Sequence, residues 1–431
     1  MIGISRRVAL MGATTAACGL AVAARSASSL SSTAYATTDE AQWAKLGALY
    51  PVTREIVQLE NAYWGSMAEP VAAAHREQVA RLNRDNSWYA RRAMIADQAR
   101  AKARAAEAMG VLPDEVGWCR NAAEGLTALI MQYRDVGAGD QILFADTDYE
   151  TTQGAMRSLA AARGAQAIKI TLPAQITRES LIEAYREAIA RAPRLKLVIL
   201  THMSHRNGLV LPVSDIVPLI KARGAQVVVD CAQSFYQIPF KVPDFGADFV
   251  GLNFHKWVGA PLGVAAIWIR KGLASAIAPA PELPDAAPDD VQAKVHQGTV
   301  DFAPQLTVPA ALDFQATIDR QAKIGRLRYL RDRWVSQVRG LAGVEVLLPD
   351  DPALYGATTS FRLHGETTAA ANIAITDVLL KRFGIMTVHR VGLAGGTCIR
   401  VTPSLFTSAA EVDQLAKALA VMAAEGPLRP A

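Results

Sequence analysis

The chain has 431 residues, of which 51% are hydrophobic and 20% charged, and its formal net charge at pH 7 is +5. This balance is typical of globular proteins; it excludes an intrinsically disordered chain, and the length allows two or three domains with a sizeable core. The arginines are scattered through helical stretches without a basic block, which is typical of solvated helix faces and predicts no nucleic-acid partner.

The first 36 residues differ in kind from the rest. Ser5-Arg-Arg7 precedes an uncharged run from Val8 to Ala24, and a small-residue stretch then ends at Ala36. This pattern predicts a twin-arginine export signal over residues 1–36, and therefore a periplasmic protein with no stable membrane insertion once the signal is removed. A membrane anchor is the alternative, although the run is only moderately apolar. Cys18 matches a lipid-attachment site weakly.

The next segments predict an N-terminal arm over residues 37–75. Helices are expected over 68–84, which overlaps the end of the arm, and over 91–109. A strand over 114–120 runs into a helix that begins with Ala122 and Ala123. Small residues at the start of a helix leave backbone N–H groups free, and the helix dipole favours an anion there. We therefore expect a phosphate site at these two alanines, with a ligand-free helix cap as the alternative.

Strands and helices then alternate. Apolar strands are expected at 141–145, 167–171, 195–200, 226–230, 248–252 and 264–269, with helices at 151–163, 178–191 and 214–223. Nearly continuous apolar strands that alternate with helices predict a buried, mostly parallel, doubly wound sheet. The large α/β domain would span residues 76–306, and a smaller C-terminal α/β domain would span 307–431.

Two residues at strand ends indicate the chemistry. Asp230 ends the strand Gln226-Val-Val-Val-Asp230, and Lys256 follows the strand that comes next. In open α/β sheets, ligands bind at the carboxyl ends of the strands. Pyridoxal 5'-phosphate (PLP) needs a lysine for its Schiff base and an anion that keeps its pyridine nitrogen protonated. Asp230 and Lys256 can supply both, so they are the candidate catalytic residues.

A family resemblance rests on six motifs taken together. They are Arg120-Asn-Ala-Ala-Glu124, Thr201-His-Met-Ser-His205, Asp230-Cys-Ala-Gln233, Asn253-Phe-His-Lys256, Gly298-Thr299 and Cys398-Ile-Arg400. In this order they resemble the class V aminotransferase family, and within it the branch described as isopenicillin N epimerase-like. The resemblance covers roughly residues 55 to 420 and implies the PLP-dependent fold type I.

The resemblance also implies roles for single residues. Gln233 would bind the phenolic oxygen of the cofactor, Tyr149 would stack on its ring, and Asn253 and His255 would contact its phosphate. His202 and His205 would line the cofactor pocket. A metal site at this His-x-x-His pair is the alternative, but no third ligand lies at a suggestive spacing.

The remaining implied roles concern substrate and partner. Arg400 would bind a substrate carboxylate, for which a planar guanidinium is the natural partner, and Asn61 and Tyr63 would face the substrate. Gly298 and Thr299 would reach the phosphate site of a neighbouring subunit, which implies a homodimer. The alternative for Asn61 and Tyr63 is a packed N-terminal arm without a substrate contact. The alternative for Gly298 and Thr299 is a plain turn.

Several reactions begin with the same proton abstraction by Lys256 at the α-carbon of an amino-acid or peptide-like substrate. Epimerisation, transamination and loss of a β-substituent all remain open. A cysteine desulfurase needs a nucleophilic cysteine on a mobile loop, and the loop 386–392 contains none. Two other classes are alternatives: a catalytically silent exported binding protein, and a nicotinamide-linked oxidoreductase, for which Gly137-Ala-Gly-Asp140 lacks the required glycine fingerprint.

Overall fold

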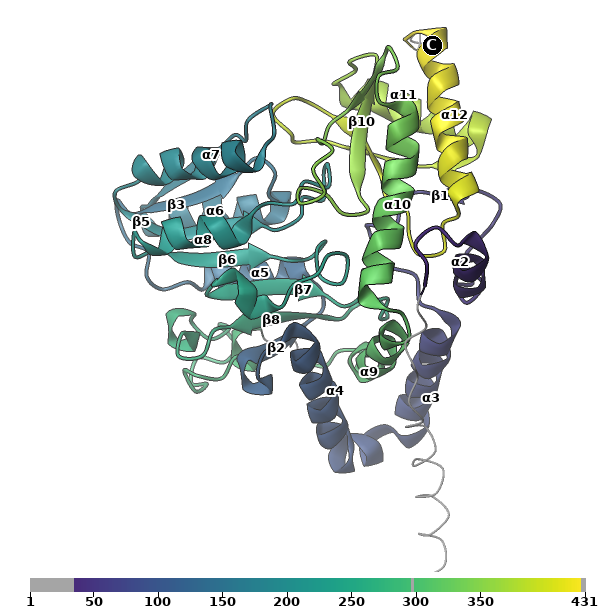
Figure 1. The fold of residues 1–431 in the computed structure, drawn as a ribbon. Helices are drawn as coiled ribbons and strands as arrows, with labels where there is room; N and C mark the ends of the chain where they lie inside the picture. Colours follow the sequence, from purple (N-terminus) through teal and green to yellow (C-terminus); the bar gives the residue numbers. More distant parts are fainter. Residues whose placement is uncertain (1–34, 296–297, 428–431) are drawn as a thin grey trace, which may run out of the picture.

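The structure is a computed structural model that describes residues 35–295 and 298–427. Figure 1 shows a large sheet flanked by helices and a smaller unit that is joined to it by a long helix. The helices are α2 (Glu40–Gly47), α3 (Glu69–Arg92), α4 (Met94–Met109), α5 (Ala122–Met131), α6 (Glu150–Arg163), α7 (Arg178–Ala190), α8 (Val213–Lys221), α9 (Ala303–Ala316), α10 (Arg320–Val338), α11 (Ala369–Phe383) and α12 (Ala409–Glu425). The strands of the large sheet are β2 (Val116–Cys119), β3 (Gln141–Ala145), β4 (Gln166–Ile170), β5 (Leu195–Thr201), β6 (Gln226–Asp230), β7 (Phe249–Asn253) and β8 (Ala265–Ile269).

The large sheet has the strand order β2-β8-β7-β6-β5-β3-β4. Neighbouring strands are parallel from β7 to β4, and β8 runs antiparallel to both β2 and β7. Strands β6, β7 and β8 are rich in apolar residues on both faces and are almost fully buried, as a sheet covered by helices on both sides requires. The predicted doubly wound architecture is therefore observed.

Helices cover both faces of this sheet and create two hydrophobic cores. Leu181 and Ile189 of α7 pack with Ile216 of α8 on one face. Leu126 of α5 and Met156 of α6 pack on the other. The parallel strands therefore end together at one buried edge, and loops and helix N-termini close over that edge.

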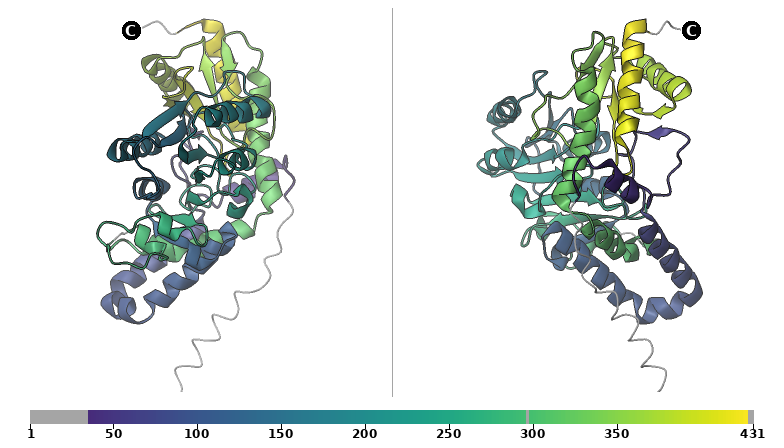
Figure 2. Two further views of the ribbon diagram at one scale, coloured as in Figure 1. Left: turned by 90° about the vertical axis from the view of Figure 1, so that its left-hand side faces the viewer. Right: turned by 45° about the vertical axis from the view of Figure 1, so that its right-hand side comes forward.

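The smaller unit is built on an antiparallel sheet of order β12-β13-β10-β9, whose strands are β9 (Val344–Val346), β10 (Thr359–Leu363), β12 (Val388–Arg390) and β13 (Cys398–Val401). Trp334 of α10 packs in its core with side chains of α11 and α12. The N-terminal arm joins this unit, because β1 (Val57–Gln58) pairs in parallel with β11 (Ile385–Met386). Figure 2 shows α10 and α12 side by side in both views, as their packing in this core requires.

The N-terminal segments of the structure differ from the expected ones in two places. Helix α2 was not expected from the sequence, and α3 runs across the expected boundary at residue 75. The domain boundaries themselves stay a prediction. The twin-arginine motif and Cys18 lie outside the described residues. Within the part of the chain that the structure describes, no helix has the length and apolar character needed to cross a bilayer.

Candidate active site

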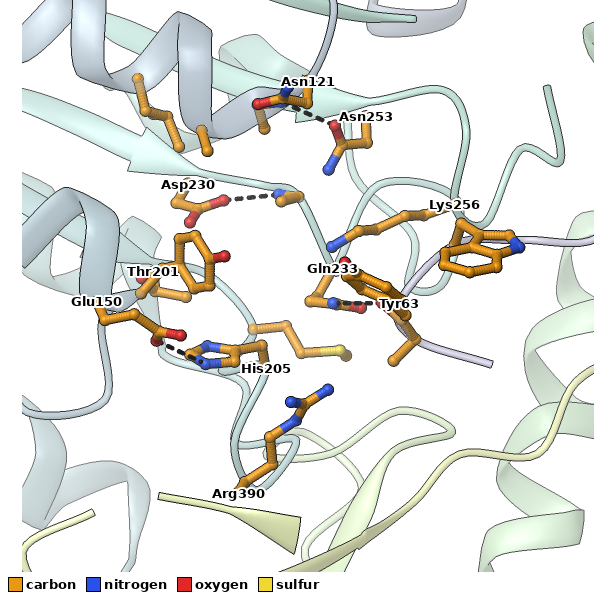
Figure 3. A pocket seen from close by; sticks show the side chains of 18 of the residues that line it. Tyr63, Asn121, Glu150, Thr201, His205, Asp230, Gln233, Asn253, Lys256 and Arg390 are labelled. Carbon is orange, nitrogen blue, oxygen red and sulfur yellow. Dashed lines mark hydrogen bonds and ion pairs between the residues drawn. The ribbon is translucent and has the colours of Figure 1, made fainter. Parts of the chain in front are cut away.

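A cavity of about 540 Å³ lies at the edge where the parallel strands end, and its lining comes from both units and from the N-terminal arm. Figure 3 shows Asp230, Lys256, His205 and Arg390 around it. The sequence-predicted residues that line the cavity are Ala122, Ala123, Tyr149, His205, Asp230, Gln233, Asn253, Lys256 and Arg400, together with Tyr63. The fold thus gathers residues that are up to about 340 positions apart in the chain.

Asp230 and Lys256 face this cavity from neighbouring strand ends. Burial raises the pKa of Asp230, while the backbone N–H of Ala232, 2.8 Å from its Oδ1, and the charge of Lys256 oppose the shift. Burial lowers the pKa of Lys256 to about 8, and the carboxylate of Asp230 opposes that shift. A lysine with a lowered pKa is more often neutral at physiological pH, which suits a nucleophile or a proton acceptor.

The backbone that carries Lys256 is held by hydrogen bonds to four consecutive carbonyl groups, those of residues 255–258. They accept in turn from the N–H of Gly65 at 2.8 Å, the N–H of Gly259 at 3.0 Å, Nζ of Lys323 at 3.0 Å and Nε2 of Gln315 at 3.0 Å. The donors come from the N-terminal arm, the local turn, α10 and α9. Each satisfied carbonyl restricts the segment, so the Lys256 side chain starts from a fixed point.

Two of these donors are unusual. A Cβ at Gly65 would lie 1.8 Å from the carbonyl oxygen of Lys256, so only glycine fits there. Lys323 is buried, and no carboxylate among the described residues pairs with it; its Nζ also donates to Oε1 of Gln315 at 2.5 Å. Burial and the nearby Arg320 lower the pKa of Lys323 to about 7. Its contacts with carbonyl oxygens make it a positioning residue for Lys256.

The N-terminus of α5 forms the upper wall of the cavity in Figure 3. Asn121 caps the helix by accepting from the N–H of Glu124 at 2.9 Å. Asn253 accepts from the N–H of Ala122 at 2.8 Å, so its Nδ2 stays available to a ligand. Free N–H groups and the helix dipole make this corner suited to an anion.

Tyr149 and His205 form the wall near α6. Their rings meet edge to face with centroids 4.9 Å apart. Nε2 of His205 lies 3.2 Å from a carboxylate oxygen of Glu150, and this hydrogen bond lowers the pKa of Glu150 to about 2. Burial lowers the pKa of His205 to about 4, so its imidazole is neutral at physiological pH. Thr201 adds a buried hydroxyl without a hydrogen-bond partner to the same cavity.

Arg400 lines the cavity, but its guanidinium is already engaged. Both its Nε and one terminal nitrogen donate to the carboxylate of Glu60, and the other terminal nitrogen donates to the carbonyl of His205. Burial lowers the pKa of Arg400 to about 10, which still leaves it charged at physiological pH. Arg390 also lines the cavity, and its guanidinium forms a longer ion pair with Glu60, at 3.5 Å.

Four expected site residues lie elsewhere among the described residues. Asn61 is buried, and its side chain donates to the carbonyls of Gln58 and Thr402, so it stabilises the arm and does not line the cavity. His255 turns its Nδ1 to the carbonyl of Val264. Gly298 and Thr299 are exposed, and Gly298 borders a separate groove.

His202 also lies away from the cavity. Its ring packs between Phe240 and Phe245, with centroids 5.0 and 4.7 Å away. His202 is the first residue after β5, and of the two histidines only His205 lines the cavity. The expectation that both histidines line the pocket is therefore half right, because the alternation of side chains along an extended segment separates them.

The site also contains four residues that were not expected from the sequence: Glu60, Arg390, Glu150 and Trp64. The last two directly follow residues that were singled out, Tyr149 and Tyr63, and both line the cavity. Glu60 also follows an apolar strand end, a signal that could have been used. Nothing in the sequence near Arg390 distinguishes it from the many surface arginines.

The comparisons with known proteins agree on one family. The model of the family described as aminotransferase class-V matches residues 69–415. The isopenicillin N epimerase of Amycolatopsis lactamdurans is 29% identical over 340 residues, covering 74% of this chain and 83% of that protein.

Two solved structures share the fold. An apo cysteine desulfurase from Thermococcus onnurineus NA1 has a TM-score of 0.76 at 17% identity, covering 91% of this chain and 100% of that chain. A C-DES variant with glycine covalently linked to its PLP cofactor has a TM-score of 0.73 at 19% identity, covering 86% and 98%.

We predict that Lys323→Met changes how stability depends on pH. In the folded wild type the Lys323 amine loses its proton near pH 7, whereas in the unfolded chain it stays protonated to about pH 10.4. The unfolded state therefore binds more protons over this window, and the wild type gains stability with rising pH, by at most about 1.4 kcal/mol per pH unit.

The measurement is urea unfolding of both proteins without cofactor at pH 7, 8 and 9. Titration of Lys256 is common to both and cancels in the difference. We expect the free energy of unfolding of the wild type to rise relative to that of Lys323→Met. Parallel pH curves would contradict a buried, unpaired ammonium at this position.

Proposed function

The chain belongs to the class V aminotransferase family and is a PLP-dependent enzyme of it, and from this premise we propose that it moves a proton at the α-carbon of an amino-acid or peptide-like substrate. Epimerisation is the reaction we favour, since an isopenicillin N epimerase is among its relatives over most of both chains. The observation that carries the proposal is the pair of Asp230 and Lys256 in one cavity that Arg390 and Arg400 also line.

The residues present fit PLP. Asp230 is a buried carboxylate that accepts from one backbone N–H, so its other oxygen can meet the pyridine nitrogen. The α5 N-terminus suits a phosphate, and the hydroxyl of Thr201 is a buried polar group without a partner in the cavity. Lys256 would hold the cofactor covalently. When bound, PLP withdraws electrons from the α-carbon and so makes its proton acidic.

The chain's own residues then act on that proton. Lys256 takes the α-proton, and its fixed backbone sets the face from which it acts. Epimerisation then requires that the new proton reach the α-carbon from the opposite face. Asp230 would hold the ring nitrogen of the cofactor in its protonated form. Tyr149 and the neutral His205, whose rings are in contact, would bound the cofactor ring on the α6 side. Gln233, whose amide donates to the carbonyl of Ala62 at 2.8 Å, would border it near Lys256.

The cysteines of the described residues favour proton transfer over desulfuration. Cys119, Cys231 and Cys398 are all buried, and burial raises the pKa of each thiol. None of them lines the cavity. Cys398 points its Sγ to the carbonyls of Arg206 and Arg390. A persulfide carrier needs an accessible thiolate, so this chain lacks one in the part that the structure describes.

Export is a further part of the proposal. Ser5-Arg-Arg7 and the uncharged run behind it support translocation by the twin-arginine pathway. That pathway carries folded proteins, which agrees with a cofactor loaded in the cytoplasm. We propose a periplasmic enzyme.

A homodimer also belongs to the proposal. An apolar groove of about 430 Å³ borders Gly298 and is lined by Ile95, Trp118 and Phe302 among others. Ile95 is 74% exposed, and an exposed apolar patch is typical of an interface. Gly298 and Thr299, exposed beside this groove, would then face a second subunit.

For the reaction, we expect holoenzyme in deuterium oxide to replace the α-hydrogen of a substrate amino acid while the visible cofactor band persists. Lys256→Ala should slow this exchange by roughly 100- to 10,000-fold or more, because it removes the proton acceptor. Proton NMR and chiral chromatography provide the measurement. Lys381→Ala, on the surface of α11, is the control and should exchange at the wild-type rate.

Other results would replace epimerisation by a different reaction. Conversion of the cofactor to its amine form indicates transamination, and release of pyruvate and sulfide from cysteine indicates a lyase. If borohydride leaves no label on the peptide that contains residue 256, the covalent role of Lys256 is wrong.

For export, we expect Arg6→Lys combined with Arg7→Lys to leave the protein in the cytoplasm, since the pathway reads the arginine pair. Cell fractionation and immunoblotting provide the measurement. Arg25→Lys, in the same segment, should not change the location. A periplasmic double variant would refute the twin-arginine route.

For assembly, we expect Ile95→Arg to convert a dimer to a monomer, because a charge in an apolar interface leaves an unpaired buried group. Size-exclusion chromatography with light scattering gives the mass. Ile373→Arg is the control, at an isoleucine of α11 that is 44% exposed. A monomeric wild type, or a dimeric Ile95→Arg variant, would contradict the proposed interface.

A further inference from the structure

Three large apolar side chains at the mouth of the active-site cavity are exposed to solvent. Tyr63 is 68% exposed, Leu262 56% and Trp64 48%. All three line the cavity that also holds Asp230 and Lys256. We call these three side chains the apolar lip. Large apolar groups that stay in water beside a ligand site are typical of a surface that a ligand covers.

The arm that carries the two aromatic residues is held on both sides of them. On the N-terminal side, Asn61 donates to two backbone carbonyls, at 3.0 and 2.8 Å, and the carbonyl of Ala62 accepts from Gln233 at 2.8 Å. On the C-terminal side, the N–H of Gly65 donates to the carbonyl of His255 at 2.8 Å. The two rings, with centroids 4.7 Å apart, therefore stand on a fixed backbone, and a surface that is formed in advance costs less to order when a ligand binds.

Leu262 reaches the cavity from a different segment, the turn after β7. That turn packs against the arm, because a Cβ at Gly259 would lie 3.2 Å from the carbonyl oxygen of Ser66. Neither segment offers a charge, since residues 61–68 and 257–269 contain no Asp, Glu, Lys or Arg. A charged group at the apolar lip would therefore lose water without gaining a partner from either segment.

The apolar lip lies at the end of the cavity where the substrate reacts. Figure 3 shows Tyr63 across the cavity from Asp230, whose carboxylate suits the ring nitrogen of the cofactor. The arm instead contacts the lysine, because a Cβ at Gly65 would clash with the carbonyl oxygen of Lys256. Lys256 acts at the α-carbon of the substrate, so a side chain that extends from this carbon toward the mouth of the cavity meets the apolar lip.

We infer that the apolar lip is a binding subsite for a flat, apolar side chain of the amino-acid or peptide-like substrate. This inference rests on the proposed function, because it names the kind of substrate that the same site takes. An aromatic ring packs on Tyr63 and Trp64 through offset or edge-to-face contacts, and Leu262 adds an aliphatic surface. Amino acids with short side chains do not reach these contacts, and charged side chains lose hydration there.

The test compares L-phenylalanine with L-alanine, which is the same molecule with a hydrogen in place of the phenyl ring. Binding of each to the holoenzyme is followed through the visible absorption of the cofactor, and the ratio of the two dissociation constants measures recognition of the ring. We expect the wild type to prefer L-phenylalanine by roughly 10-fold or more, and Trp64→Ala to lose roughly 10-fold of this preference. Leu262→Ala should lose about threefold, and Trp64→Phe should keep most of the preference.

Trp88→Ala is the matched control and should keep the wild-type ratio. Trp88 of α3 is also exposed, at 72%, but lies outside the lining of the cavity. A second readout reports the contact itself and needs no turnover. In holoenzyme labelled with 5-fluorotryptophan, L-phenylalanine should shift the fluorine NMR signal that is lost in Trp64→Phe and leave the signal of Trp88 in place. L-alanine should shift the Trp64 signal less.

The outcomes separate this inference from the proposed function. Equal ratios in the wild type and Trp64→Ala would overturn the subsite, as would an equal loss of affinity for both probes, which indicates an effect through the backbone of Lys256. A lower mass of Trp64→Ala in light scattering would show that a second subunit covers the apolar lip, and the inference would be wrong. A wild-type holoenzyme that responds to neither probe refutes the proposed function itself.

Discussion

The fixed backbone of residues 255–258 is the constraint on which the site depends. Four consecutive carbonyl groups accept hydrogen bonds from Gly65, Gly259, Lys323 and Gln315. Three of these donors are distant in sequence and belong to the N-terminal arm, α9 and α10. The position of Lys256 therefore depends on both units and the arm being folded together. A proton acceptor that acts at one carbon needs this kind of fixed placement.

The same edge of the sheet concentrates buried charge, and the fold satisfies most of it with backbone groups. Asp148 is fully buried and accepts from the N–H groups of Ala145 and Thr201 at 2.6 and 3.1 Å; burial nevertheless raises its pKa to about 7. It joins the ends of β3 and β5 and fixes the start of α6, where Tyr149 lies. Hydrogen bonds of this kind hold the walls of the cavity in place where loops form them.

The arginine pair gives the small unit a part in the wall of the cavity. Its sheet carries Arg390 and Arg400 to the cavity, while β1 of the arm brings Glu60 between them through its pairing with β11. A cofactor site built only by the large sheet would have no such cationic wall. Solved cysteine desulfurase structures share the fold, so the fold alone does not determine the reaction.

From the sequence alone one could predict the succession of strands and helices along the chain, the doubly wound class, and the candidates Asp230 and Lys256. These follow from local patterns, since apolar strands that end in polar residues place those residues at one sheet edge. The sequence could not decide which way a side chain turns or what it meets. His202 and His205, three residues apart, turn to different sides of their segment, and aromatic rings of distant segments enclose the first. The sequence suggested Asn61, His255 and Arg400 as site residues, but it did not show their partners. Asn61 donates to the carbonyls of Gln58 and Thr402, His255 contacts the carbonyl of Val264, and Arg400 pairs with Glu60. Only the tertiary structure brings those partners together, because hydrogen-bond and ion-pair choices are made between groups that the chain places in contact after it folds.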